Sequence, residues 1–205
     1  MNLIFFDTET NGLPKNWRAS MSNVDNWPRV IQLSWLVADE HENILRKQNH
    51  IIYPDGWKVP EEKFWIDNGN NTGKCMVRGI PMNVAIDLFL WDYKDCDAMI
   101  SHNMEFDFNV LGAEMLRYGK KTDKRATRLC TKELTTDLCK IPFGNDRRPW
   151  MNKNYKWPSL AELHNFLFNK PFEGAHDAWN DVIALHDCFF ELVKRNVIAL
   201  KVQPV

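Results

Sequence analysis

Two acidic residues stand at the end of the first apolar run of the chain. Residues 2–10 read Asn-Leu-Ile-Phe-Phe-Asp-Thr-Glu-Thr, and Asn11 and Gly12 then indicate a turn. Because side chains alternate between the two faces of a β-strand, Asp7 and Glu9 point the same way. Carboxylates on one face repel each other unless a cation lies between them, and Mg²⁺ and Mn²⁺ prefer such oxygen ligands. An isolated pair of this kind is more often a solvated strand end, so the metal hypothesis depends on acids from other segments.

Later segments supply those acids. A helix is expected over residues 104–118, and Asp107 falls in its first turn. The longest helix is expected over 177–197, with Asp181 on its apolar side, where a carboxylate is costly unless it is paired or metal-bound. His176 lies five residues before Asp181, close enough to reach the same cavity. Together these residues suit two divalent ions that activate a water on one side of a phosphorus atom, while the histidine takes the proton.

The ordered set of motifs resembles the DEDDh group of 3′→5′ exonucleases, in the DnaQ-like family. The similarity is carried by residues 6–13 (Phe-Asp-Thr-Glu-Thr-Asn-Gly-Leu), 102–107 (His-Asn-Met-Glu-Phe-Asp) and 176–181 (His-Asp-Ala-Trp-Asn-Asp). The motifs follow the family's order and spacing and span nearly the whole chain. A histidine stands five residues before the last aspartate, where the sister group has a tyrosine four residues before it, and this indicates the DEDDh members.

The resemblance implies a fold and a role for each matched residue. The implied fold class is α/β, a ribonuclease H-like fold in which a mixed central β-sheet is flanked by α-helices. Asp7 would bridge two divalent ions, Mg²⁺ or Mn²⁺, while Glu9 and Asp181 would complete the shell of one of them. Asp107 would act at the other ion largely through water, and His176 would be the general base.

The resemblance also implies the reaction, a metal-dependent 3′→5′ exonuclease cleavage that releases nucleoside 5′-monophosphates. Thr10 and Phe106 would lie beside the terminal nucleotide. Single-stranded DNA with a free 3′ end is the favoured substrate, because the scissile nucleotide must be splayed into the pocket. The alternatives are an RNA-trimming exoribonuclease that uses the same site and a nucleic-acid-binding protein that keeps the fold without cutting. Family members often carry His-Gly-Ile-Thr where residues 68–72 read Asn-Gly-Asn-Asn-Thr, so substrate contacts on that side depart from the pattern.

Composition limits the remaining classes. The chain has 205 residues, 44% of them hydrophobic, which suits a single exonuclease domain over residues 1–205. The formal net charge of -1 means that contact with a polyanion must be local or metal-mediated. Five cysteines without a Cys-x-x-Cys pair favour reduced thiols over disulfides or a zinc knuckle. Without a recognisable signal peptide or membrane span, we expect a cytoplasmic, free-standing exonuclease with no membrane contact, and the sequence identifies no polymerase or repair partner.

The remaining strands and helices follow from hydrophobic periodicity. Strands are expected over 29–38 and 44–53, paired antiparallel because a tight turn joins them, and a short buried strand over 98–101. Helices are expected from Met82, with Val84, Leu88 and Trp91 on the apolar face, over 131–140, and from a capping box at Ser159 and Glu162 to about Phe168.

Four segments are interpreted as loops. In residues 13–28, Trp17 and Trp27 are expected to pin the loop rather than to stack on a base. Residues 54–81 show no clear pattern. Residues 120–128 form a basic stretch, expected to be a solvated connection with phosphate contact as the alternative, and 141–158 interleaves basic and aromatic residues in a way that suits a single nucleic-acid strand.

Overall fold

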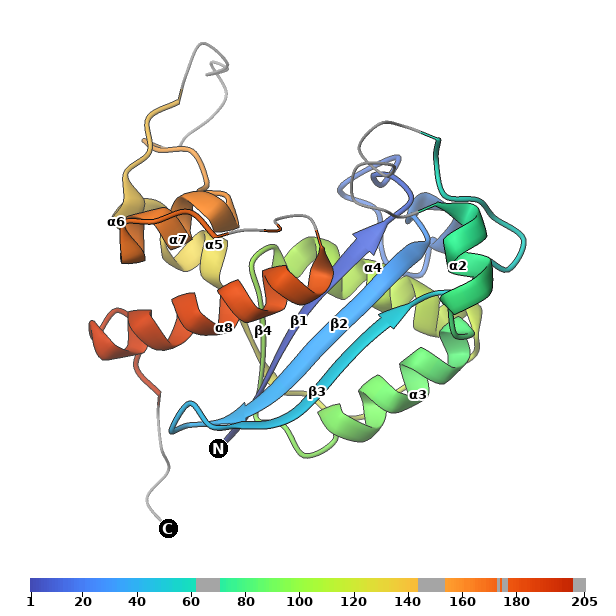
Figure 1. Ribbon diagram of the computed structural model, residues 1–205, viewed down its shortest axis with the longest axis horizontal. Helices are drawn as coiled ribbons and strands as arrows, with labels where there is room; N and C mark the ends of the chain where they lie inside the picture. Colours follow the sequence, from blue (N-terminus) through green and yellow to red (C-terminus); the bar gives the residue numbers. More distant parts are fainter. Residues whose placement is uncertain (62–70, 144–153, 173, 175–176, 201–205) are drawn as a thin grey trace.

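A mixed β-sheet organises the molecule. The computed structural model describes residues 1–61, 71–143, 154–172, 174 and 177–200. Its strands are β1 (Asn2–Thr10), β2 (Val30–Asp39), β3 (Ile44–Ile51), β4 (Ala98–Ser101) and β5 (Thr127–Cys130), in the order β3-β2-β1-β4-β5. β1 pairs antiparallel with β2 and parallel with β4, and β2 pairs antiparallel with β3, as predicted (Figure 1).

Helices cover both faces of this sheet. On one face lie α3 (Met82–Tyr93) and α4 (Met104–Arg117), and on the other lie α7 (Leu160–Phe168) and α8 (Ala178–Lys194), which crosses the strands (Figure 1). Ile4 and Phe6 of β1 point into the first core, and Leu3 and Phe5 point into the second. The short elements are η1 (Val24–Asn26), α2 (Thr72–Arg78), α5 (Thr131–Leu134) and α6 (Thr136–Cys139). The predicted mixed sheet with flanking helices is confirmed.

Two elements were missed by the sequence patterns. α2 lies inside residues 54–81, where we expected only a loop, and it begins where the Asn71 side chain accepts a hydrogen bond from the Lys74 amide. β5 covers Thr127 and Arg128, which we assigned to a solvated connection. It is an edge strand with its first residues exposed, so it carries little of the apolar pattern that reveals a buried strand.

Two predicted helical faces were partly wrong. Val84 and Trp91 of α3 are 41% and 67% exposed, and the face toward the sheet is instead formed by Met82, Ala85, Ile86 and Phe89. In α4, hydrophobic spacing predicts an apolar face with Val110, Ala113 and Leu116; the first two are buried, but Leu116 is 46% exposed. The helix expected over 131–140 is divided at Thr135 into α5 and α6, and the Thr135 hydroxyl bonds back to the Thr131 carbonyl.

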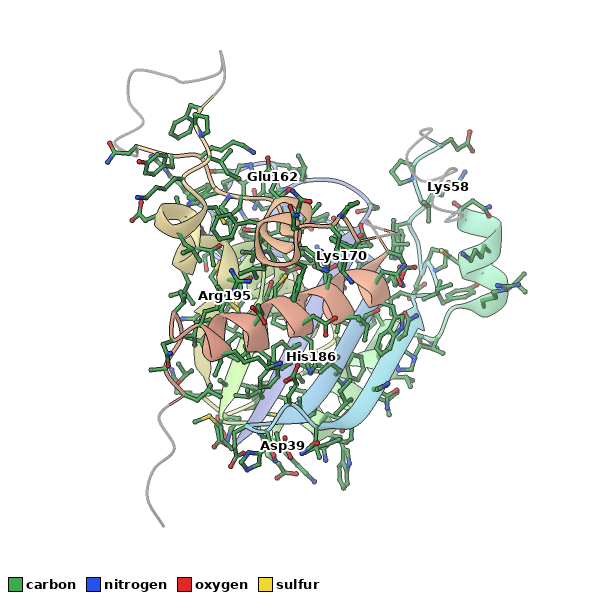
Figure 2. The ribbon with its side chains drawn as sticks, turned by 60° about the vertical axis from the view of Figure 1, so that its left-hand side comes forward. Asp39, Lys58, Glu162, Lys170, His186 and Arg195 are labelled. Atoms are coloured by element: carbon green, nitrogen blue, oxygen red, sulfur yellow. The ribbon has the colours of Figure 1, made fainter. Side chains whose placement is uncertain are left out.

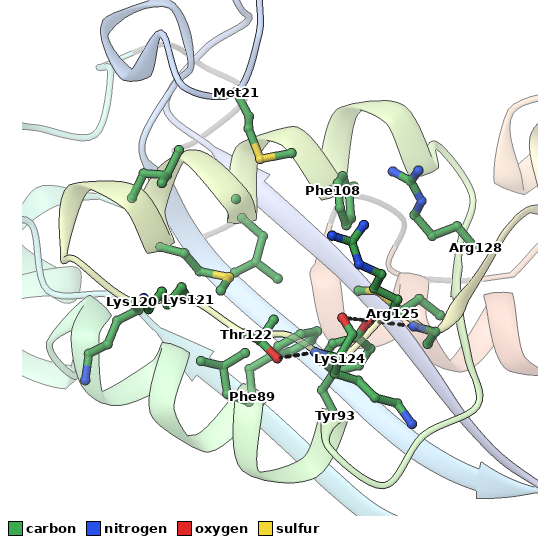
Figure 3. A pocket seen from close by; sticks show the side chains of 17 residues that line it. Met21, Phe89, Tyr93, Phe108, Lys120, Lys121, Thr122, Lys124, Arg125 and Arg128 are labelled. Atoms are coloured by element: carbon green, nitrogen blue, oxygen red, sulfur yellow. Dashed lines mark hydrogen bonds between the residues drawn. The ribbon is translucent and has the colours of Figure 1, made fainter.

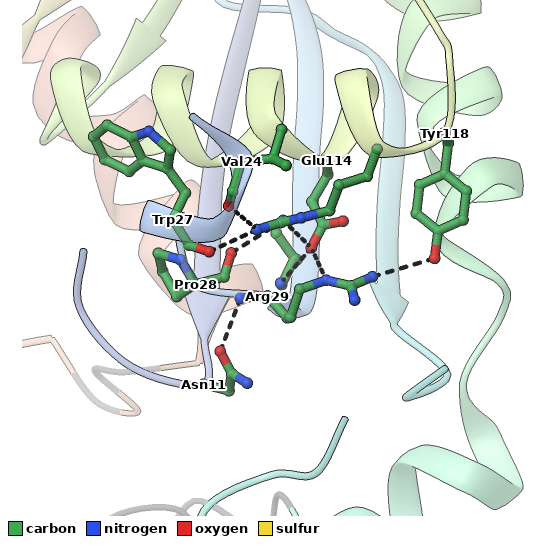
Figure 4. Close-up of polar contacts among 9 residues, drawn as sticks. Asn11, Val24, Trp27, Pro28, Arg29, Glu114 and Tyr118 are labelled. Carbon is green, nitrogen blue, oxygen red and sulfur yellow. Dashed lines mark hydrogen bonds and ion pairs between the residues drawn. The ribbon is translucent and has the colours of Figure 1, made fainter. Parts of the chain in front are cut away.

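The loop after β1 is fastened to α4 by a buried carboxylate (Figure 4). Glu114 is 1% exposed, and its Oε1 accepts a hydrogen bond from Arg29 Nε at 2.8 Å and pairs with Arg117 Nη1 at 3.1 Å. Arg117 Nη2 in turn donates to the carbonyls of Val24 and Trp27, at 2.6 Å each. The ends of the loop are therefore held beside the acidic end of β1. Trp27 is buried and pins the loop as predicted, whereas Trp17 is 48% exposed and does not.

Local hydrogen bonds hold the C-terminal helices α7 and α8, and Figure 2 labels Glu162 and Arg195, which take part in them. Ser159 and Glu162 form the predicted capping box at the start of α7. Arg195, at the end of α8, donates through Nη2 to the Leu167 carbonyl at 2.5 Å, which joins α8 to α7. The predicted apolar face of α8, with Val182, Leu185 and Phe189, is buried against the sheet. All five cysteines are free, as expected. In the described part of the chain, no helix combines the length and apolar character needed to span a membrane.

Candidate functional site

Three carboxylates from two elements converge at the end of β1. Asp7 and Glu9 come from β1 and Asp181 from the first turn of α8, and one oxygen from each lies within 4.8 Å of the other two. All three side chains are partly buried. The structure therefore brings three of the four predicted acids together.

The fold brings these residues together for simple reasons. Asp7 and Glu9 continue the alternation of Leu3 and Phe5, so they point to the face that α8 covers. α8 begins at Asp177, whose Oδ1 accepts hydrogen bonds from the Trp179 and Asn180 amides. That cap fixes where the helix starts over the strand, and Asp181 follows one turn later. Gln32 of β2 reaches across to Asp177 Oδ2 at 3.2 Å.

Asp107 approaches from the opposite face of the sheet and is 2% exposed. Its Oδ1 accepts hydrogen bonds from the amide and the hydroxyl of Thr8, at 3.2 and 2.7 Å, and its Oδ2 accepts one from Ser101 at 2.5 Å. It does not share the 4.8 Å cluster of the other three acids. Hydrogen bonds from Thr8 on β1 and Ser101 on β4 therefore hold this carboxylate beside the cluster.

Mutual repulsion and burial raise the pKa values of these acids. Burial raises the pKa of Glu9 to about 8, and the charges of Asp181 and Asp107 add to the effect. Burial also raises the pKa of Asp7 well above its usual value, helped by Asp107 and Asp181. The pKa of Asp107 rises only to about 6, because its hydrogen bonds from Ser101 and Thr8 favour the charged form.

This donor set fits a hard divalent cation. The converging atoms are all carboxylate oxygens, which is the ligand chemistry of Mg²⁺ and Mn²⁺ rather than of softer metals. A cation among them would offset the repulsion that raises the pKa values of Asp7 and Glu9.

Of the three other predicted site residues, the structure describes Thr10 and Phe106. His176 lies outside the described residues. Thr10 is buried, and its hydroxyl donates to the Gly12 carbonyl at 2.7 Å, in the turn after β1. Phe106 is half-buried in the first turn of α4, and its ring centre lies 5.8 Å from that of Trp17. Trp17 is itself half-exposed, and because Phe106 directly precedes Asp107, this aromatic pair lies at the same end of α4 as that acid.

The sequence patterns did not identify Lys132 as a site residue. Its Nζ lies 2.5 Å from Asn103 Oδ1 and 4.3 Å from the centre of the Trp157 ring, and its charge lowers the pKa of Asp107. A signal existed, because the carboxyl ends of parallel strands meet at one edge of a sheet and Lys132 lies two residues after the end of β5. The signal was lost because β5 itself was missed.

His102 has a structural role in the molecule. Its Nε2 donates to the Pro158 carbonyl and its Nδ1 accepts from the Thr131 hydroxyl, each at 2.9 Å. Burial lowers the pKa of His102 to about 4, so the ring is neutral at physiological pH. It joins the segment before α7 to the end of β4 beside the acids.

Comparison with solved structures identifies the fold as ribonuclease H-like, in agreement with the prediction. E. coli exonuclease I in complex with a dT13 oligonucleotide is similar over 94% of this chain and 41% of that one, at 16% identity and a TM-score of 0.68. Exonuclease I from Methylocaldum szegediense is similar over 95% and 40%, at 17% identity and a TM-score of 0.69. A zinc-bound E. coli exonuclease I–single-stranded DNA complex gives 16% identity and a TM-score of 0.69.

The chain spans about two fifths of the length of these exonuclease I structures. No protein-family model matches it, and no curated protein matches it in sequence. The similarity to exonuclease I therefore lies in the fold.

Proposed function

We propose that the chain is a metal-dependent 3′→5′ exonuclease acting on single-stranded DNA. The observation that carries the proposal is the convergence of Asp7, Glu9 and Asp181 within 4.8 Å, with Asp107 buried beside them. Acids that raise each other's pKa values without a cation are characteristic of a functional site. The similar folds solved with single-stranded oligonucleotides support this substrate class.

Each acid has a distinct part in holding two Mg²⁺ or Mn²⁺ ions. Asp7, Glu9 and Asp181, whose oxygens converge within 4.8 Å, would supply ligands to these ions, with Asp7 as the shared ligand. Asp107, which accepts hydrogen bonds from Thr8 and Ser101, would act through water. When bound, such ions activate a water and stabilise the leaving oxygen at a phosphorus atom. His176 takes the proton from the attacking water.

The terminal nucleotide lies beside Thr10 and Phe106 in this proposal. The half-exposed Trp17 ring next to Phe106 extends the apolar surface on which a splayed base can stack. Lys132 places a positive charge near Asp107, where the backbone phosphate of the substrate approaches the acids. Its ammonium group is held in place by Asn103 and the Trp157 ring.

A labelled-strand assay tests the proposal. Single-stranded DNA and RNA of the same sequence, each labelled at the 5′ end, are incubated with Mg²⁺, Mn²⁺ or EDTA, beside the Asp7→Asn variant. We expect a metal-dependent ladder that shortens from the 3′ end, faster on DNA, and absent in the variant. A faster ladder on RNA would assign the chain to exoribonucleases. Retarded migration of the strand without cleavage would assign it to non-catalytic binding proteins.

A further inference from the structure

A second hollow, away from the acids, lies between α3, α4 and the segment 120–128 (Figure 3). Its volume is about 390 Å³. Apolar side chains line it from both helices and from β4, among them Phe89, Tyr93, Leu111 and Met99. Nothing in the proposed reaction uses this cavity.

The rim of the cavity is strongly basic. Lys121, Lys124, Arg125 and Arg128 line it together with Lys120. Lys120 pairs with Asp87 at 2.6 Å, but within the described residues the other four make no ion pair with a carboxylate. Because the net charge of the chain is only -1, this is a local concentration of positive charge. The occupant that complements it is an anion with apolar or aromatic groups.

The cavity continues toward the acids along α4. Arg128 lies over the Phe108 ring, 4.3 Å from its centre, and both residues also line a neighbouring hollow that reaches Met104 in the first turn of α4. That turn carries Asp107 at the acidic edge. Glu105 and Glu133 line the same hollow, so an anion passing through it is expected on the Arg128 side.

We propose that this cavity, rimmed by Lys121, Lys124, Arg125 and Arg128, binds the single strand upstream of the 3′ end. The inference rests on the proposed function, since it assigns the rest of the same substrate. An Arg side chain next to an aromatic ring suits single-stranded nucleic acid, because the Arg can contact a phosphate and the ring can stack on a base. From Asp107 to Leu116 the helix rises ~14 Å, which about four stacked nucleotides span. A dinucleotide held at the acids therefore does not reach Arg125, whereas a longer strand does.

The test compares strand lengths in a charge-reversal variant. Lys121→Glu with Arg125→Glu changes two exposed side chains, and Lys47→Glu on the exposed side of β3 is the matched control. Binding of a fluorescent strand of about ten nucleotides is measured by anisotropy in EDTA, so that cleavage does not interfere. We expect the Kd to rise about tenfold in the double variant, with a smaller salt slope, and to stay unchanged in the control.

Hydrolysis of a dinucleotide with Mg²⁺ separates this inference from the proposed function. We expect the double variant to match the wild type on the dinucleotide, because the cavity is out of its reach. An unchanged Kd for the long strand would overturn the inference, and an acidic protein segment would then be the better candidate occupant of the cavity. Failure of the wild type to cleave any strand would overturn the proposed function instead, while the anisotropy measurement would still report on the cavity.

Discussion

The acids at two places in the molecule have opposite electrostatic surroundings. Glu114 on α4 forms ion pairs with Arg29 and Arg117, so cations of the chain itself neutralise its charge. Asp7 and Glu9 on β1 are surrounded by Asp181 and Asp107, and each of these neighbours raises their pKa values. The chain's own cations neutralise Glu114, whereas in the proposed function cations from solution would neutralise the acids of β1.

This difference separates a structural acid from a functional one. Removing a partner from the Glu114 group leaves an uncompensated buried charge, which costs stability. In the proposed function, removing a carboxylate charge from the β1 group weakens metal binding and activity. Stability is kept, because the repulsion among the remaining acids is smaller. The following changes test the contrast, beginning with the largest expected effect.

Asp7→Asn gives the largest loss of activity. The substitution keeps the volume of the side chain and removes the charge at the centre of the cluster, so we expect hydrolysis to fall roughly 10⁴-fold or more. The melting temperature of the metal-free protein should not fall, because repulsion with Glu9 is relieved. Single-turnover hydrolysis and thermal melting in EDTA measure the two effects. An active variant would contradict the assigned centre.

His176→Ala is expected to slow hydrolysis by ~10²- to 10⁴-fold near neutral pH, the range for loss of a general base. Strand binding in EDTA should stay the same, and added imidazole should restore part of the rate. The measurement is the pH dependence of kcat for both proteins. Full activity of the variant would show that another group takes the proton.

Glu114→Gln should behave in the opposite way to Asp7→Asn. It leaves Arg29 and Arg117 without their shared carboxylate, and we expect the free energy of unfolding to fall by about 2 kcal/mol. Urea denaturation measures the change. The folded variant should bind metal as the wild type does, and a loss of metal binding without a loss of stability would reverse the assignment of the two groups.

The raised pKa of Glu9 predicts how stability depends on pH. Folded Glu9 titrates at about 8, against an ordinary value of 4.5, so the folded protein holds a proton that the unfolded chain has lost between these values. The contribution of Glu9 to stability in EDTA is therefore full below about pH 4.5 and is lost as the pH rises through about 8. Saturating Mg²⁺ should flatten this part of the profile, because the cation replaces the proton. Thermal melting across the pH range, with Glu114→Gln as control, checks this.

Lys132→Met should have the smallest effect. Its positive charge near Asp107 is expected to attract the backbone phosphate, so we expect the KM for single-stranded DNA to rise about tenfold with kcat little changed. Steady-state kinetics at two salt concentrations measure this, since loss of a phosphate contact also lowers the salt slope. An equal fall in kcat and kcat/KM would place Lys132 in the chemical step.

Sequence patterns found the strand end, the acids and the longest helix because each has a strong local signal. Asp7 and Glu9 follow an apolar strand, and Asp181 lies in line with buried residues of α8. The patterns missed β5, whose exposed edge position removes the apolar alternation, and with it they missed Lys132. They also missed the hydrogen bonds from Thr8 and Ser101 to Asp107, since a side-chain hydrogen bond does not produce a periodic pattern in the sequence.

Calorimetric titration with Mn²⁺ tests the central claim most directly, namely that the acids of β1 and α8 are a metal centre rather than a structural cluster. The wild type, Asp7→Asn and Glu114→Gln are titrated at the same pH. We expect two Mn²⁺ ions to bind to the wild type and to Glu114→Gln, and binding to Asp7→Asn to be strongly weakened. Equal Mn²⁺ binding by all three proteins would contradict the account, because the charge of Asp7 would then have no part in holding metal.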